Sequence, residues 1–185
     1  DSKNNFKSKL QVNNFSEEVA LQKFSAMYLK LKYLKGEFFV KDVFRNLYVQ
    51  AEKSFESDQT NTPIPDIVKS IFLKLPHEKL INKTRKNIKF AKLLFKPNSN
   101  FQLLTNDRNT EMGLMLLCIN KNIRDSLKSY LIDKNIYPAI LWPGQNNEID
   151  KFYENRVLFV HADFRYNSDD ISFIIKHINN FNKYV

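Results

Sequence analysis

The chain has 185 residues, which is enough for one sizeable domain or for one domain with a helical extension. Its hydrophobic content of 43% and aromatic content of 14% are typical of a folded protein. Only three glycines occur, which excludes a glycine-rich phosphate-binding loop, and the single cysteine excludes an internal disulfide and a cysteine-based zinc site. The three histidines are widely spaced, so we expect no metal site.

The net charge of +9 is compatible with an anionic partner such as a nucleic acid. The lysines are spread along the whole chain, however, so we interpret most of them as solvated helix faces and regard nucleic acid as an unlikely partner. No apolar run approaches the roughly 20 residues of a membrane span, and no signal peptide opens the chain. We therefore expect no membrane contact and a cytoplasmic location.

Residues 1–62 are predicted to form a polar leading segment and a helical hairpin. The polar segment covers residues 1–14, and Ser16 is a suitable N-cap for the first helix, 16–34. Gly36 is placed to end that helix, and a second helix is expected over 38–55. Both carry apolar side chains at helical spacing, as two packed antiparallel helices require.

The clearest break in the chain is the polar stretch 57–65, which ends in two prolines. We place a domain boundary there, so that the second domain covers 63–185. Asp66 is suited to cap a short helix, and Pro76 to open a longer one.

The rest of the second domain alternates short apolar runs with one amphipathic helix. We expect strands at 101–104 and 112–119, joined by a hairpin loop at 105–110, and then a helix over 123–132. Cys118 falls within the second apolar run, which indicates a buried, unreactive thiol.

The C-terminal part is predicted to contain two further strands, at 137–143 and from Val157, joined by a polar loop. Ser168 is expected to cap a final helix, whose apolar face consists of Ile171, Ile174, Ile175 and Ile178. The predicted fold class is α+β: a small, mostly antiparallel sheet covered by helices and preceded by a long helical hairpin.

Several stretches resemble one known family in both order and spacing. They are KLKYL at 30–34, TRKN at 84–87, RDSLKSYL at 124–131, YPAILWP at 137–143 and VLFVHADFRY at 157–166. Together they look like the C-terminal part of fold-type I enzymes that depend on pyridoxal phosphate. The likeness is strongest to the DegT/DnrJ/EryC1/StrS sugar aminotransferases.

This resemblance implies a PLP-dependent transferase-like small domain and amino transfer to a keto-sugar or a related carbonyl substrate. In that family the lysine that binds pyridoxal phosphate lies in a large domain, upstream of everything matched here. We therefore expect this chain to hold no cofactor and to be inactive alone. Its expected partners are the large domain, or a second copy through the helices within 16–55, together with a small-molecule substrate.

Three residues are candidates for substrate binding, and none is a candidate for catalysis, cofactor binding or metal binding. Arg165 follows a strand and precedes a helix, and a guanidinium suits a carboxylate or phosphate. It could instead be a surface arginine paired with Asp163 or Asp169. Trp142 and Tyr137 are suited to pack against a ring, although core packing is the alternative.

Two other interpretations stay open. Arg85 and Asn87, two residues apart on a helix, suit helix ends or domain docking. The chain as a whole could also be a non-catalytic basic α+β module that contacts nucleic acid or a protein. The apolar strand 112–119 lacks the basic and aromatic pattern of a typical RNA-binding strand, which counts against nucleic acid.

Overall fold

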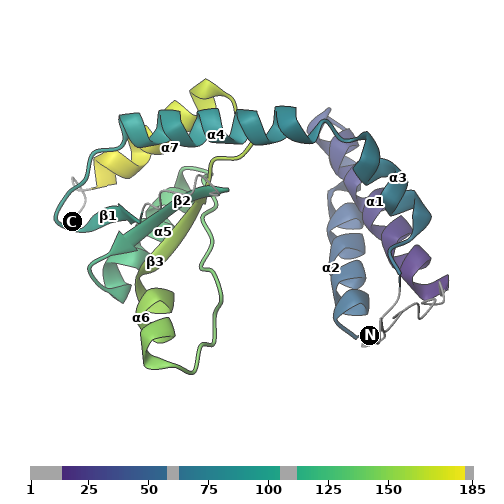
Figure 1. Ribbon diagram of the computed structural model, residues 1–185, viewed down its shortest axis with the longest axis horizontal. Coiled ribbons are helices and arrows are strands. Elements are labelled where there is room, and N and C mark those ends of the chain that lie inside the picture. The colour runs from purple at the N-terminus through teal and green to yellow at the C-terminus, as the bar shows by residue number, and fades with distance from the viewer. Residues whose placement is uncertain (1–13, 58–62, 105–111, 182–185) are drawn as a thin grey trace, which may run out of the picture. The chain divides into compact units, whose positions relative to one another are not determined.

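The computed structural model describes residues 14–57, 63–104 and 112–181, and it divides into two compact units, Asp1–Leu75 and Pro76–Val185 (Figure 1). The units divide later than the boundary predicted after residue 62, because the short helix α3, Asp66–Lys74, belongs to the first unit. The predicted polar segment and the predicted hairpin loop at 105–110 lie outside the described residues, apart from Asn14.

The first described element of the first unit is α1, Asn14–Leu34, which starts earlier than predicted. Ser16 therefore lies inside the helix, and its prediction as the N-cap was wrong. Gly36 ends the helix as predicted. Its φ of +105° is a backbone conformation that favours glycine, and its amide donates to the carbonyl of Tyr33 at 3.0 Å.

The second arm of the hairpin is a 3₁₀ turn, η1 (Phe38–Val40), followed by α2, Lys41–Ser57. The helix predicted from residue 38 thus starts as a tighter turn. Tyr33 packs on Phe44 across the hairpin, with ring centroids 5.5 Å apart. The buried apolar side chains in the described part of this unit include Val19, Ala26, Val40, Phe44 and Ala51.

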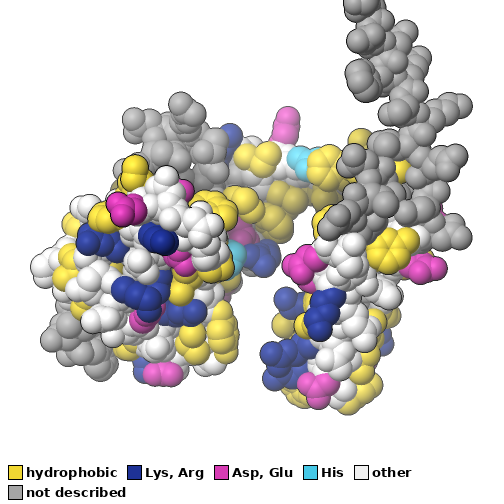
Figure 2. Space-filling view, turned by 90° about the horizontal axis from the view of Figure 1, so that it is seen from below, with side chains coloured by type: hydrophobic (Ala, Val, Ile, Leu, Met, Phe, Trp, Pro, Cys, Tyr) yellow, Lys and Arg dark blue, Asp and Glu magenta, His cyan; other side chains and the backbone are white. Residues whose placement is uncertain are grey.

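Many large apolar side chains of the first unit remain exposed. On the face drawn in Figure 2, apolar side chains are interspersed with Lys and Arg side chains. The exposed apolar residues of the hairpin include Leu21, Met27, Tyr28, Leu31, Leu34, Phe38, Phe39, Val43, Val49 and Phe55. No helix in the described part of the chain has the length and apolar character that crossing a bilayer requires.

The second unit is built on an antiparallel sheet in the order β1-β2-β3. The strands are β1, Phe101–Leu104, β2, Gly113–Cys118, and β3, Val157–His161. Leu116 of the central strand pairs with Leu103 on one side and Leu158 on the other. Because directly paired residues of neighbouring strands project to the same side, these three lie on the same face of the sheet.

That face is covered by three helices: α4, His77–Leu94, α5, Lys121–Asp133, and α7, Ser168–Asn180. The core between them is apolar, and the thiol of Cys118 lies within it, where burial raises its pKa to about 11. The fully buried members of this core with the largest side chains are Phe101, Leu116, Leu127, Leu131, Leu158, Ile171, Ile175 and Ile178. The predicted α+β fold, with its small antiparallel sheet, covering helices and helical hairpin, is confirmed.

The opposite face of the sheet carries the alternate residues of each strand, among them Met115, Phe159 and His161. Gly113 pairs with His161 there, and a Cβ on this glycine would lie 2.4 Å from the carbonyl oxygen of Val160 and 2.7 Å from the ring of Phe159. Only glycine therefore allows this close approach.

Two features of the C-terminal part differ from the predictions. The predicted strand at 137–143 is limited to a single bridge, in which Ala139 exchanges two hydrogen bonds with Phe159. Trp142 has a φ of +49°, outside the extended region of the backbone, so the segment cannot continue as a strand through residue 143. The predicted polar loop contains a helix, α6, Glu148–Arg156, which the sequence interpretation missed.

The N-cap of α7 is Asn167, and the prediction of Ser168 was wrong. The Asn167 side chain accepts from the amides of Asp169 and Asp170, while the carboxylate of Asp170 accepts from the amide of Asn167. This is a reciprocal capping box. It satisfies more helix-end groups than a serine one residue later would.

Candidate functional site

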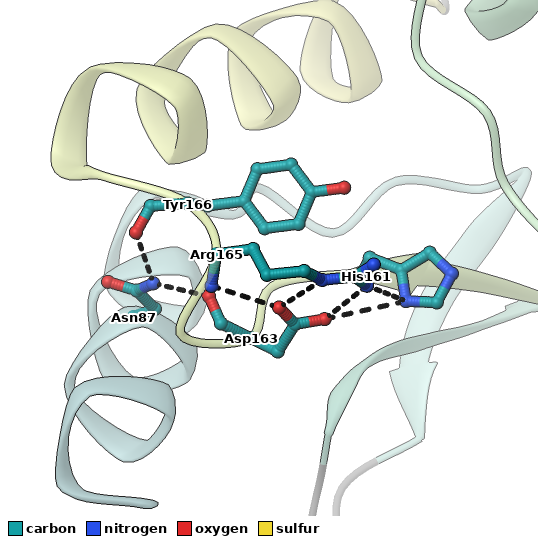
Figure 3. Close-up of polar contacts among 5 residues, drawn as sticks. All are labelled: Asn87, His161, Asp163, Arg165 and Tyr166. Atoms are coloured by element: carbon teal, nitrogen blue, oxygen red, sulfur yellow. Dashed lines mark hydrogen bonds and ion pairs between the residues drawn. The ribbon is translucent and has the colours of Figure 1, made fainter. Parts of the chain in front are cut away.

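Arg165 lies in the turn that joins the end of β3 to the start of α7 (Figure 3). Oδ1 of Asp163 accepts from the backbone amide of Arg165 at 3.0 Å. The carbonyl of Asp163 accepts from the amide of Tyr166 at 3.2 Å. An aspartate that accepts from the backbone two residues further on stabilises a tight turn. This turn therefore fixes where Arg165 leaves the backbone.

The Arg165 guanidinium forms a two-bonded ion pair with Asp163. Nε donates to Oδ1 at 2.8 Å, and Nη2 donates to Oδ2 at 2.7 Å. The Asp163 side chain is only 6% exposed, whereas that of Arg165 is 56% exposed. Among the described residues, none forms a hydrogen bond with Nη1 of Arg165. A buried carboxylate thus orients an accessible cation that keeps donor capacity.

His161 extends this pair toward the open face of the sheet. Its Nδ1 lies 3.4 Å from Nη2 of Arg165 and 3.7 Å from Oδ2 of Asp163. Its ring packs edge-on against Phe159, with centroids 4.9 Å apart. A neutral imidazole with an unprotonated Nδ1 can accept a hydrogen bond from the guanidinium. His161 therefore limits the directions in which Arg165 can move.

Asn87 of α4 ties the turn to the helical layer. Its Nδ2 donates to the carbonyl of Asp163 at 2.8 Å and to the carbonyl of Tyr166 at 3.0 Å. The residue is buried, so these bonds are not in competition with solvent. Asn87, His161, Asp163, Arg165 and Tyr166 together are called the Arg165 cluster below (Figure 3).

The charges of the cluster are set by its geometry. Burial acts to raise the pKa of Asp163, but the side-chain and backbone hydrogen bonds from Arg165 outweigh it and lower that pKa. The hydrogen bond to Asp163 raises the pKa of Arg165 in turn. Burial raises the pKa of Tyr166. At neutral pH the site therefore holds a charged ion pair beside a neutral phenol.

The three predicted substrate residues do not converge on one site. Arg165 takes part in the ion pair with Asp163 that the sequence left open as the structural alternative. Trp142 is 71% exposed and lines a separate pocket. Tyr137 is 67% exposed and belongs neither to that pocket nor to the Arg165 cluster. Substrate binding by these residues stays a prediction.

The sequence interpretation missed His161 and gave Asn87 a less specific role. His161, Asp163 and Arg165 alternate along the chain, at a spacing that puts side chains on one face of a strand. That spacing was the signal for His161. Asn87 could not be assigned in this way, because its two acceptors are carbonyls far along the chain.

The described residues do not fit pyridoxal phosphate. A lysine that forms a Schiff base at neutral pH must be desolvated or placed beside positive charge. The buried polar side chains of the described ranges are Asn87, Arg124 and Asp163, and none of them is a lysine. Within the same ranges, no group of His, Cys, Asp or Glu is arranged to hold a metal ion.

No protein family model matches the chain, and no curated protein matches it significantly.

Proposed function

We propose that the chain is the C-terminal portion of a PLP-dependent aminotransferase-like protein that transfers an amino group to a keto-sugar or a related carbonyl substrate. The α+β unit then serves as the small domain, and it is not catalytic alone. The observation that carries the proposal is the Arg165 ion pair. The Asp-x-Arg-Tyr stretch of the family resemblance forms a buried carboxylate that orients an accessible guanidinium.

The role of the cluster in this function is to bind an anionic group of the substrate. Arg165 offers a planar set of donors, which matches a carboxylate or a phosphate better than a lysine does. Asp163 fixes the orientation of the guanidinium, and Asn87 fixes the turn that carries both residues. These residues bind and orient the substrate, and the chemistry depends on groups outside this chain.

The test uses the intact product of the native gene. We expect it to contain bound pyridoxal phosphate and to transfer an amino group from an amino acid to a keto-sugar nucleotide. Substituting Arg165→Lys should raise KM about 10-fold or more with a smaller change in kcat, because lysine cannot keep the two-bonded ion pair with Asp163 and at the same time donate to an anion from a fixed direction. Arg45→Lys, on an exposed part of α2, is the matched control.

The control should leave both kinetic constants unchanged. An intact product without cofactor and without amino transfer would overturn the proposal. A cofactor-containing, active product with an unchanged KM in the Arg165 variant would remove Arg165 from the substrate site and leave the family assignment in place.

A protein-contact role is the second candidate, and the exposed apolar side chains of the hairpin favour it. Phe38 and Phe39 are 70% and 82% exposed, and apolar side chains continue along both helices. Exposed apolar patches of this kind mark interaction surfaces. The occupant is the large domain or a second copy of the chain. Light scattering of the 185-residue chain tests self-association, and a monomer well above micromolar concentration would contradict it.

A further inference from the structure

A pocket of about 310 Å³ lies on the face of the sheet opposite the helical core. Leu104, Met115 and Val157, one residue from each strand, contribute apolar surface to it. The other lining residues come from the segment after Ala139 and from α6, namely Leu141, Trp142, Gln145, Asp150, Tyr153 and Glu154. A pocket of this size and composition suits a small organic molecule.

The segment that carries Trp142 is held in an unusual conformation. Trp142 has a φ of +49°, in the left-handed region that bulky side chains rarely adopt. Its carbonyl accepts from Nε2 of Gln145 at 2.9 Å, and the carboxylate of Glu154 accepts from the amides of Gly144 at 2.8 Å and Gln145 at 3.0 Å. A strained and exposed tryptophan held by its surroundings is a feature of binding sites.

The wall of the pocket is anchored to the core by a buried arginine. Arg124 of α5 is 3% exposed, and its Nη1 donates to the carbonyl of Glu154. Its Nε and Nη2 donate to the carboxylate of Asp125. Glu154 is therefore fixed at its backbone by α5, while its side chain fixes the Trp142 segment. The aromatic wall is pre-organised before any ligand arrives.

The charges of the pocket favour a cation. Among the residues that the structure describes, Asp150 and Glu154 line it and no lysine or arginine does, although the chain as a whole carries +9. The hydrogen bonds from the Gly144 and Gln145 amides lower the pKa of Glu154, so this carboxylate is charged at neutral pH. The rings of Trp142 and Tyr153 offer negative faces that attract a cation.

We infer that this pocket binds a small organic ammonium ion, with Trp142 and Tyr153 as its aromatic contacts and Asp150 as its carboxylate. An anion is disfavoured by both carboxylates. A neutral ring gains the aromatic contact but not the electrostatic attraction. The inference does not depend on the proposed function, because neither Arg165 nor its partners line the pocket.

The experiment uses the intrinsic fluorescence of the 185-residue chain, because Trp142 is its only tryptophan. Choline is titrated at constant ionic strength, and its neutral isostere 3,3-dimethyl-1-butanol, glucose and acetate are titrated in parallel. We expect a saturable change with choline and at least a fivefold weaker response to the isostere.

Asp150→Asn removes a charge from the pocket, and it should weaken choline binding about fivefold. Asp133→Asn removes a charge from the exposed end of α5, away from the pocket, and should leave binding unchanged. Tyr153→Leu gives a second variant that keeps the charge and loses one ring, and it should also weaken binding. Circular dichroism confirms that each variant is folded.

Equal binding of choline and the isostere, or saturable binding of glucose or acetate without choline, would overturn the inference. No saturable change with choline would overturn it as well. Vesicles of phosphatidylcholine separate a free ion from a lipid headgroup. Sedimentation with vesicles in the absence of free-choline binding would contradict the small-ion inference.

Discussion

The helices α2 and α7 have similar apolar faces but very different surroundings. On α7, Ile171, Ile174, Ile175 and Ile178 are each at most 6% exposed, because the sheet and two other helices cover them. On α2, Phe44 and Ala51 are buried against α1, while Val43, at the edge of the same face, is 52% exposed. One apolar face is enclosed by its own unit, and the other is only partly covered.

The two units therefore gain different amounts of stability from their own internal packing. Most of the stability of a protein helix comes from burial of an apolar face and not from helix propensity. The α+β unit provides that burial itself. The hairpin leaves a large part of its apolar surface exposed, so its own packing contributes less to the free energy of unfolding.

The largest contrast is expected between a core leucine and a hairpin leucine. Leu158 is fully buried in β3, and Leu158→Ala should lower the free energy of unfolding by about 2–5 kcal/mol, because it removes buried surface and leaves a cavity. Leu34 is 69% exposed, and Leu34→Ala should change the free energy of unfolding by less than about 0.5 kcal/mol. Urea denaturation followed by circular dichroism measures both, and equal effects would break the comparison.

A smaller effect is expected from the loss of the Asn87 hydrogen bonds in the Arg165 cluster. Asn87→Ala removes two hydrogen bonds and leaves the carbonyls of Asp163 and Tyr166 without that donor. The expected loss is about 1–3 kcal/mol in the free energy of unfolding. Asn155→Ala, on the exposed surface of α6, is the control and should be neutral. An unchanged free energy of unfolding in the Asn87 variant would show that solvent replaces these hydrogen bonds without loss of stability.

Acid should weaken the α+β unit through Asp163. Its folded pKa is lower than its unfolded pKa, so its contribution is complete above the unfolded value of about 3.9 and is lost as the pH falls through the folded value. Asp163→Asn should make the free energy of unfolding less dependent on pH in this acidic range. Asp133→Asn, at an exposed position, should not. Urea midpoints measured between neutral pH and strong acid provide the test.

The smallest effect on stability is expected at the exposed surface of the hairpin. Phe39 is 82% exposed, so Phe39→Ser should change the free energy of unfolding by less than about 0.5 kcal/mol. The same substitution should weaken self-association if a second copy covers this surface. Analytical ultracentrifugation separates the two effects. Unchanged association would place the contact elsewhere on the hairpin.

Periodicity predicted most helices, because apolar spacing alone reports which face of a helix is apolar. It does not report what covers that face, which is why the stripe of α2 could not be distinguished from that of α7. The strand predicted at 137–143 failed for a different reason. Its residues are apolar enough for a strand, but a strand needs an extended backbone, and Trp142 has a φ of +49°.

The helix α6 was missed because its sequence is short and largely polar. It is stabilised by its N-cap Asn147 and by the contact of the Glu154 carbonyl with Arg124, and neither follows from apolar spacing. In the Arg165 cluster, the pairing with Asp163 was foreseen as one alternative. The support from Asn87 was not foreseen, because it joins segments that are distant in sequence.

Asparagine side chains, which carry no charge, cap several helix ends in the α+β unit. The side chains of Asn120, Asn147 and Asn167 each accept a backbone amide at a helix start. Asn179 caps the opposite end of α4 by bonding the carbonyl of Leu94 and the amide of Lys96. An amide does not titrate in the range where carboxylates gain protons. The hydrogen bonds that these asparagine side chains form therefore persist in acid, even where the ion pair of the Arg165 cluster and the Asp170 half of the α7 capping box are lost.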